Sequence, residues 1–464
     1  MSSKPTPVSA DVSRRDFLRI SALAGMATFG MPAILHAQNG GTKLNVAVVG
    51  LGTQGCNRLR DVMGCGVNIV AFCDVDAAMI KKAKEEMVKK DANFPVESLA
   101  VFEDYRKMLA ECKNLDAVII TTPDHWHAPI AKAAMLAGKH VFCEKPLTHT
   151  ISEARELREL AAKSKVVTQM GNQGSDTKNM RRAIELIQAG VLGQVKEVHC
   201  WASGSGAHPG LAMPTEGDPV PAGFNWDAWV GPAPLRPFKA KYYHPWNWRG
   251  WHDFGSGAMG DFGCHNLNLP FRALELDYPT SIDVDAQLMG LPTYPKDARI
   301  RYDFAQRGKL SPVTVWWYDG GRRPASEVIP AALTEHLGGK VGDGVLIIGE
   351  KGFTFGGCWS GADYIKLNDE EKLSGILNHA ASKSIPETLP HSVGHVKEWV
   401  EACMGKGKCF SDFETGGHLT EIALSGVVAL RTGKKLQWNG PAMKATNAPE
   451  ADQYIYAKYR KGWV

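Results

Sequence analysis

One stretch near the start of the chain limits its possible folds more than any other. The apolar run at residues 44–49 is followed by GLGTQG at residues 50–55 and then by a helical pattern. Gly50 allows a tight turn, Gly52 lets another group approach the backbone, and Gly55 allows close packing of helix on strand. The G-x-G-x-x-G pattern alone is a weak signal. Between a strand and a helix, it predicts a site where a dinucleotide pyrophosphate meets free backbone N–H groups.

Apolar runs continue to alternate with helical stretches as far as residue 174. Further strands are expected within residues 67–73, 115–121, 141–143 and 165–174. Strands that alternate with helices predict an α/β fold with a doubly wound parallel sheet. Such sheets bind ligands at the carboxyl ends of their strands, so polar residues at those ends are candidate site residues.

Asp74 lies at one of these strand ends, nineteen residues after Gly55. A carboxylate here can accept hydrogen bonds from both ribose hydroxyls of NAD and would repel the 2′-phosphate of NADP. Asp74 could instead cap the next helix, although Asp76 can also fill that role. We therefore expect NAD as the cofactor in preference to NADP.

Lys145 occupies a second strand end, within the sequence EKP at residues 144–146. Proline holds the residue before it in an extended conformation, so the lysine is fixed at the end of a buried strand. A lone Lys-Pro pair would be a strand cap with solvated charges. Because Thr122 and Gln173 are expected at neighbouring strand ends, Lys145 is predicted to face the ligand.

The order of these motifs resembles the Gfo/Idh/MocA oxidoreductase family. The resemblance is carried by the glycine loop, by TTPDHWH at residues 121–127 and by AGKHVFCEKP at residues 137–146. It extends over roughly residues 43–440 and implies an N-terminal Rossmann domain followed by an α+β domain with a large, mainly antiparallel open sheet. The expected boundaries are 43–172 for the Rossmann domain, 173–440 for the substrate and oligomerisation domain, and 441–464 for a C-terminal tail.

In the family, the EKP lysine is usually joined by an aspartate and a histidine one helical turn apart. Asp261 and His265 match this pattern, since residues i and i+4 share one face of a helix. The resemblance thus implies that His265 takes a hydroxyl proton, Lys145 stabilises the charge developing on the oxygen, and Asp261 orients the histidine or holds a neighbouring hydroxyl. Where many members carry a further aspartate, this chain has Asn268.

The residues expected to bind the dinucleotide come from the glycine loop and the strand ends. They are Gly50, Gly52, Thr53, Gln54, Gly55, Asp74, Thr122, Pro123, His127, Glu144, Lys145 and Gln173.

The expected substrate site lies in a tryptophan-rich stretch. Six of the thirteen tryptophans fall between Trp201 and Trp251. Aromatic faces beside hydrogen-bonding groups suit the apolar C–H faces and polar rims of a sugar, although each single tryptophan could equally be a core residue. The residues expected to contact the substrate are Tyr243, Trp248, Arg249 and His252.

No metal site is expected. His125, His127, His252, Asp253 and Cys264 are ligand-type residues, but their spacing matches no familiar zinc pattern. The ten cysteines include no C-x-x-C pair and fall largely in apolar runs, which favours buried, reduced thiols.

The first 37 residues resemble a twin-arginine export signal. SRRDFLR at residues 13–19 precedes a modest apolar stretch that ends near Ala37. That stretch is too short and too rich in glycine and alanine for a stable membrane anchor, the alternative interpretation. We therefore expect a periplasmic protein, exported already folded around its cofactor.

These observations favour an exported NAD(P)-dependent oxidoreductase that transfers a hydride to or from a secondary alcohol of a sugar, polyol or glycoside and retains its cofactor. The alternative is a glycosidase or lyase that oxidises its sugar transiently; the EKP lysine favours net oxidation or reduction, because hydrolytic branches of the family often lack it. A non-catalytic sugar-binding protein would require loss of the lysine–aspartate–histidine set.

Partners other than a carbohydrate follow from charge and from the resemblance. The formal charge is only +4 and there is no basic run, which argues against nucleic acid. The resemblance implies a homo-oligomer, either a dimer or a tetramer.

Overall fold

The computed structural model describes residues 43–204, 210–287 and 291–464. The export signal expected at residues 1–37 lies outside these ranges. None of the helices within them is both long and apolar enough to cross a membrane.

The first domain is built on a six-stranded sheet with the order β3-β2-β1-β4-β5-β6, and all of its pairings are parallel. This confirms the predicted doubly wound sheet. The first three strands extend to one side of β1, and the chain then returns to place β4 on the other side of β1. The strand order therefore reverses between β1 and β4, and the glycine loop after β1 lies at this switch point. The strands are β1 (Asn45–Val49), β2 (Asn68–Cys73), β3 (Ala100–Phe102), β4 (Ala117–Ile120), β5 (His140–Glu144) and β6 (Thr168–Gly171).

Helices cover both faces of this sheet. Along β1, Val46 and Val48 belong to one hydrophobic cluster while Ala47 and Val49 belong to another, so alternate side chains are buried on opposite faces. The helices are α3 (Thr53–Met63), α4 (Ala77–Lys90), α5 (Tyr105–Glu111), α6 (Asp124–Leu136) and α7 (Ile151–Lys163), with a short 3-10 turn η1 (Val96–Ser98).

The second domain contains a ten-stranded sheet with the order β14-β13-β12-β11-β7-β10-β9-β8-β15-β16. Only the β7–β10 pairing is parallel, which confirms the expected mainly antiparallel sheet. The strands are β7 (Val195–Trp201), β8 (Ser281–Ala286), β9 (Ala298–Phe304), β10 (Val313–Asp319), β11 (Gly344–Gly349), β12 (Gly352–Gly357), β13 (Tyr364–Leu367), β14 (Ser374–Gly375), β15 (Leu436–Asn439) and β16 (Lys444–Ala445).

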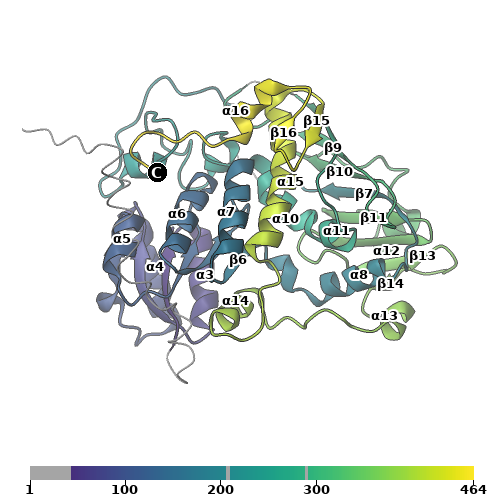
Figure 1. Ribbon diagram of the computed structural model, residues 1–464, viewed down its shortest axis with the longest axis horizontal. Coiled ribbons are helices and arrows are strands. Elements are labelled where there is room, and N and C mark those ends of the chain that lie inside the picture. The colour runs from purple at the N-terminus through teal and green to yellow at the C-terminus, as the bar shows by residue number, and fades with distance from the viewer. Residues whose placement is uncertain (1–42, 205–209, 288–290) are drawn as a thin grey trace, which may run out of the picture.

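Most helices of this half lie between its sheet and the first domain or around the sheet edges (Figure 1). The helices are α8 (Lys178–Gln188), α9 (Trp226–Val230), α10 (Gly257–Asn266), α11 (Asn268–Ala273), α12 (Ala331–His336), α13 (Ala380–Ser384), α14 (His395–Cys403), α15 (Phe413–Thr432) and α16 (Asp452–Ile455), with 3-10 turns η2 (Gln173–Asp176), η3 (Asn247–Gly250) and η4 (Pro449–Ala451). Leu333 of α12 is instead buried with Leu346 on the other face of the sheet, since the alternate residues Val345 and Ile347 belong to the main cluster.

Two late helices join the domains. α15 packs against α7 of the first domain and against α10 and β8 of the second. α14 packs against α3, and its Trp399 is fully buried in the hydrophobic cluster of the first sheet. The chain therefore returns to the Rossmann domain after building the antiparallel sheet, which holds the two units together.

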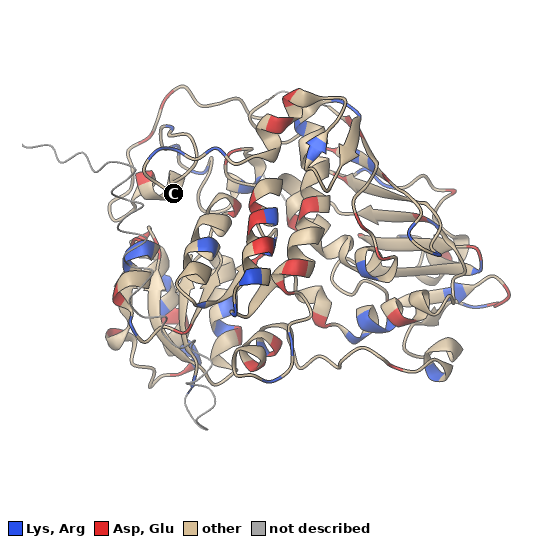
Figure 2. Ribbon diagram, viewed as in Figure 1, with Lys and Arg blue, Asp and Glu red and all other residues tan. Residues whose placement is uncertain are grey.

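The α7–α15 contact contains a buried charge cluster. Glu421 is 1% exposed, and its carboxylate accepts hydrogen bonds from Arg155 at 2.7 Å, from Arg158 at 2.6 Å and from the Tyr278 hydroxyl at 3.1 Å. Blue and red segments meet where these helices face each other (Figure 2). Because several donors surround this carboxylate, its removal would leave two partly buried guanidinium groups without their main counter-ion.

We expect Glu421→Gln to lower the free energy of unfolding by about 3 kcal/mol, because breaking a buried ion pair leaves an uncompensated charge. Equilibrium urea denaturation followed by tryptophan fluorescence measures the change. Glu414→Gln is the matched control, since Glu414 also pairs with Arg158 but is 61% exposed, and it should cost under about 1 kcal/mol. Equal effects of the two substitutions would contradict a special role for the buried carboxylate.

Candidate active site

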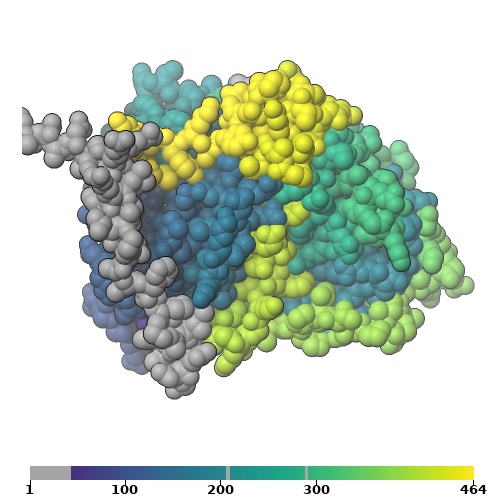
Figure 3. All heavy atoms as spheres, viewed as in Figure 1, coloured from purple at the N-terminus to yellow at the C-terminus, as the bar shows by residue number. Residues whose placement is uncertain are grey.

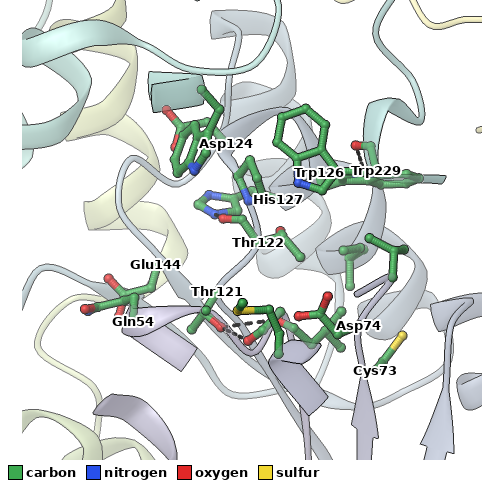
Figure 4. A pocket seen from close by; sticks show the side chains of 18 of the residues that line it. Gln54, Cys73, Asp74, Thr121, Thr122, Asp124, Trp126, His127, Glu144 and Trp229 are labelled. Atoms are coloured by element: carbon green, nitrogen blue, oxygen red, sulfur yellow. Dashed lines mark hydrogen bonds between the residues drawn. The ribbon is translucent and has the colours of Figure 1, made fainter. Parts of the chain in front are cut away.

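A cavity of about 1280 Å³ lies at the carboxyl ends of the first sheet and is closed by segments of the second domain. In Figure 4, Gln54 and Glu144 lie on one side, Asp74 on the other, and Thr122 and His127 between them. The predicted site residues that line the cavity are Gly50, Gly52, Thr53, Gln54, Asp74, Thr122, Pro123, His127, Glu144, Lys145, Gln173, Trp248, Arg249 and Asp261.

The glycine loop has the geometry of an anion cradle. Gly50 has a φ of +85°, and a Cβ there would lie 2.7 Å from the Thr122 nitrogen. A Cβ on Gly55 would lie 2.1 Å from the Gly50 oxygen, whereas a Cβ on Gly52 would meet open space. α3 begins within this loop, at Thr53, with no side-chain cap, so its first N–H groups are available to a phosphate. The residues present therefore fit a dinucleotide pyrophosphate.

Asp74 stabilises the same loop. Its two carboxylate oxygens accept hydrogen bonds from the backbone nitrogens of Leu51 at 2.5 Å and Asp76 at 2.9 Å. Burial raises the pKa of Asp74 to about 6. The helix cap that Asp74 could have supplied is made by Asp76, which accepts from the Ala78 nitrogen. Asp74 lines the cavity and retains lone pairs for hydroxyl donors.

Lys145 and Asp261 form an ion pair that crosses between the domains. Both side chains are about nine-tenths buried, and the Arg249 guanidinium lies 3.4 Å from the second oxygen of Asp261. Burial alone would raise the pKa of Asp261, but the charges of Arg249 and Lys145 outweigh it and lower that pKa to about 2. The aspartate is therefore ionised throughout the physiological pH range, and it holds the lysine ammonium at the cavity wall.

His265 lies beside this pair, on the same helix α10 as Asp261. It is 4% exposed, and neither ring nitrogen has a hydrogen-bond partner in the described residues. Burial, reinforced by the positive charge of Lys145, holds the pKa of His265 well below its usual value. The imidazole is therefore neutral at pH 7, with one nitrogen able to accept a proton.

Glu144 and Gln173 are held by a residue that the sequence motifs did not identify. Arg58, on α3, lies 3.0 Å from a Glu144 oxygen. When the Gln173 amide is oriented to satisfy its neighbours, its oxygen accepts from Arg58 at 2.7 Å and from Gln54 at 3.1 Å. Arg58 thus ties the glycine helix to the strand end that carries Lys145.

His127 lines the cavity, but its polar atoms are engaged elsewhere. One ring nitrogen lies 2.8 Å from the Pro146 oxygen and the other 2.8 Å from the Thr122 oxygen. The ring therefore joins the turn after β4 to the turn after β5. It shapes the wall and leaves no free nitrogen for a ligand.

Two of the four predicted substrate residues do not reach the cavity. Tyr243 is fully buried among aromatic rings, 4.9 Å from Trp251 and 5.6 Å from Trp226. His252 packs edge-on against Tyr294 at 4.4 Å, and burial lowers its pKa to about 3. The structure therefore does not place this pair at the cavity, because the tryptophan-rich stretch packs on itself and buries most of its rings.

The remaining predicted site residues, Gly55 and His265, do not line the cavity themselves. Gly55 packs against the backbone of Gly50. Asn268, which replaces the aspartate of many family members, is buried and donates to the Ser175 hydroxyl at 2.7 Å while accepting from Arg272 at 2.8 Å. It therefore belongs to the interior of the second domain.

The structure adds Trp359, which no motif indicated, and places two further tryptophans of the tryptophan-rich stretch at the cavity. Trp359, in the turn between β12 and β13, lines the cavity, is 54% exposed and lies 4.3 Å from the His265 ring between ring centroids. Trp246 and Trp229 also line the cavity. Within the described ranges there is no group of three or more His, Cys, Asp or Glu residues placed to hold a metal ion. All ten cysteines are unpaired.

Together, the doubly wound parallel sheet and the anion cradle define a Rossmann fold of the dinucleotide-binding class. Residues 44–172 match the Gfo/Idh/MocA profile described as "Oxidoreductase family, NAD-binding Rossmann fold". Residues 206–310 match the profile of its "C-terminal alpha/beta domain", and the two matches cover half of the chain. The protein belongs to the Gfo/Idh/MocA oxidoreductase family.

Curated relatives match only part of the chain. A "Glycosyl hydrolase family 109 protein" of Shewanella putrefaciens is 27% identical over 205 residues, which cover 40% of this chain and 44% of the relative. A protein of the same name from Saccharopolyspora erythraea is 29% identical over 202 residues, which cover 39% and 44%. The chain thus spans less than half of the length of these relatives.

Solved structures match over most of the chain. The WlbA dehydrogenase of Bordetella pertussis, in complex with NADH and UDP-GlcNAcA, has a TM-score of 0.57 at 16% identity, covering 86% of this chain and 99% of its own. A levoglucosan dehydrogenase in complex with NADH and L-sorbose has a TM-score of 0.54 at 16% identity, covering 85% and 99%. At 16% sequence identity, this similarity establishes a shared fold only.

Asp74 generates a prediction about pH. Because its carboxylate form would accept hydrogen bonds from the ribose hydroxyls and its pKa is about 6, affinity for NADH should fall as the pH drops from 7 to 5, approaching tenfold per unit below pH 6. Fluorescence titration with NADH at each pH measures this. Asp74→Asn should bind more weakly and without that dependence.

Asp104→Asn is the control for this titration. Asp104 also lines the cavity and caps a helix, but its hydrogen bonds with Arg106 outweigh burial and lower its pKa. This variant should keep the wild-type pH profile. An unchanged profile in Asp74→Asn would show that another group controls binding.

Proposed function

We propose that the protein is an NAD-dependent oxidoreductase that oxidises or reduces a secondary alcohol of a sugar, polyol or glycoside. The observation that carries this proposal is the buried Lys145–Asp261 pair with neutral His265 beside it, at the cavity that holds the glycine loop. A charged donor and a neutral acceptor side by side are what alcohol oxidation requires.

Bound NAD would supply the acceptor for the hydride that leaves the carbon carrying the hydroxyl group. Lys145 would donate a hydrogen bond to the hydroxyl oxygen and stabilise the negative charge that develops there. His265 would accept the hydroxyl proton on a ring nitrogen and return it when the reaction runs toward the alcohol. Asp261, supported by Arg249, holds the lysine in position so that no reorientation is needed during the reaction.

A carbohydrate substrate is supported by the aromatic wall. Trp248 and Trp359 line the cavity beside Arg249 and His265, and Trp246 lines it as well. Their faces suit sugar C–H groups, while the charged groups can bind hydroxyls. The solved structures of similar fold that contain UDP-GlcNAcA or L-sorbose are consistent with such a ligand. We propose NAD in preference to NADP because Asp74 would repel a 2′-phosphate.

A second candidate is favoured by the glycosyl hydrolase family 109 relatives. In such a reaction, oxidation of one sugar carbon makes the neighbouring C–H acidic, the glycosidic substituent leaves, water adds, and the carbonyl is reduced back. The same lysine, aspartate and histidine would act, and the cofactor would end in its starting state. The EKP lysine favours net oxidation or reduction.

We also propose that the protein is exported with its cofactor bound and that it forms a homo-oligomer. The SRRDFLR segment supports passage through the twin-arginine pathway to the periplasm. Free NAD is not expected there, so the cofactor would stay bound and be recycled by a second sugar or an external electron carrier. The family resemblance supports a homo-oligomer, either a dimer or a tetramer.

Purified protein incubated with a panel of sugars and aryl glycosides should produce NADH absorbance with at least one sugar and no aglycone release. Lys145→Ala and His265→Ala should each lower turnover at least about a hundredfold, since each removes a group that acts on the reacting hydroxyl. Both variants should still bind NADH, because the glycine loop is intact.

Lys139→Ala is the matched control, since Lys139 directly precedes the same strand and bonds only to the Leu115 oxygen. It should keep wild-type turnover. Aglycone release without net NADH formation would favour the glycosidase. Near-normal turnover of both active-site variants on the true substrate would overturn the catalytic assignment.

The arginine pair generates a separate prediction. Arg14→Lys combined with Arg15→Lys should retain the precursor in the cytoplasm, as followed by fractionation and immunoblotting. The wild-type periplasmic protein should release about one dinucleotide per chain on denaturation, because many backbone and charge-assisted hydrogen bonds hold the pyrophosphate. A periplasmic protein that carries no nucleotide would contradict retention of the cofactor.

A further inference from the structure

The cavity continues past Asp74, away from the Lys145–Asp261 pair, and ends in a second group of aromatic residues. This end is lined by the first turn of α5, by α6 and by Trp463. The lining residues are Tyr105, Arg106, Trp126, Ile130 and Trp463. Nothing in the proposed chemistry of the alcohol uses them.

Trp463 reaches this end through a segment that crosses both domains, residues 456–464. Its Tyr459 hydroxyl donates to Glu153 on α7 at 2.7 Å, and its Arg460 pairs with Asp227 on α9 at 2.6 Å. The Arg460 Nε also donates to the Gly231 oxygen at 2.9 Å. In Figures 1 and 3 this yellow segment runs from α16 across to the first domain. It is therefore a fixed strap with anchors on both domains.

At the end of the strap, the Trp463 ring is held in a defined position. It packs edge-on against Trp126, with 5.8 Å between ring centroids. The guanidinium carbon of Arg106 lies 5.5 Å from the Trp463 ring, and Asp104 holds Arg106 at 2.9 Å. The guanidinium carbon of Arg460 lies 5.1 Å from the centroid of the same ring. The ring is only partly buried and lines the cavity, so its exposed part offers a ligand a flat, apolar surface with two cationic neighbours.

The order of the strand ends along the cavity limits which part of a dinucleotide could reach this surface. The glycine loop would bind the pyrophosphate in the middle of the molecule, and the reacting end must lie near Lys145 and His265. Asp74 would then hold the adenosine ribose, so the adenine must extend beyond it, toward α5. Aromatic faces and arginine are the groups that stack on nucleobases.

We propose that Trp463 and Arg106 bind the adenine ring, and that the strap at residues 456–464 closes the path by which the dinucleotide leaves. This inference rests on the dinucleotide part of the proposed function and is independent of the substrate. It supplies a physical cause for cofactor retention: dissociation requires loss of the stack together with displacement of the strap from both of its anchors.

The test is the rate of NADH dissociation from the purified full chain, measured by stopped-flow displacement with excess NAD. Trp463→Ala should increase the dissociation rate constant about tenfold or more, the size of effect that loss of one base–aromatic stack produces. Trp463→Phe retains a ring and should stay within about threefold of wild type. Tyr459→Phe, which removes one anchor, should increase the rate a few-fold.

Tyr456→Ala is the matched control, since it removes a 42% exposed ring from the same segment. It should leave the rate unchanged. Fragments separate an adenine contact from a general loosening: Trp463→Ala should weaken ADP-ribose binding and leave nicotinamide mononucleotide binding unchanged. Equal losses for both fragments, or an unchanged NADH rate in Trp463→Ala, would overturn the inference. If the wild-type protein did not bind NADH, the assignment of a dinucleotide site would be wrong. If it bound NADH but acted on no sugar, the inference about Trp463 would still hold.

Discussion

The Lys145–Asp261 ion pair is the interaction on which the arrangement of the site depends. Each partner comes from a different domain, and both are largely removed from water. Desolvation of two charges is costly, so such a pair persists only where further charges and hydrogen bonds compensate. Arg249 supplies the compensation, because it lies between Asp261 and Asp124 and stacks on Trp248. Any movement of the second domain relative to β5 would expose or unpair a buried charge.

A few hydrogen bonds and ion pairs also link the glycine loop to the strand end that carries Lys145. Asp74 stabilises the glycine loop through the Leu51 nitrogen, and Arg58 connects the following helix to Glu144. Glu144 directly precedes Lys145. Arg58 therefore connects the helix that follows the glycine loop to the strand end that carries the lysine. His127 provides a parallel link between the turns after β4 and β5.

Much of the first domain and of the candidate site could be predicted from the sequence, wherever a residue lies close in the chain to the pattern that places it. The glycine loop, Asp74 and Lys145 each sit next to a strand whose apolar pattern gives its end, and Asp261 and His265 share one helix face. The positions of Tyr243 and His252 behind the cavity wall could not be predicted, because an aromatic-rich segment has no periodicity that separates rings packed on each other from rings that face a cavity. Arg58 was missed because its partner, Glu144, lies 86 positions away, and no spacing rule connects them.

Residues from the later parts of the chain complete both ends of the cavity, which explains why its full extent could not be read from the nucleotide-binding motifs. Trp359 reaches His265 from a turn between two strands of the antiparallel sheet, and Gly174 permits that approach, since a Cβ there would lie 2.5 Å from the Trp359 oxygen. Trp463 reaches the opposite end along the strap. In the proposed function, the Rossmann core would thus carry the chemistry at Lys145, while residues from distant loops would contact the substrate at one end of the cavity and the cofactor at the other.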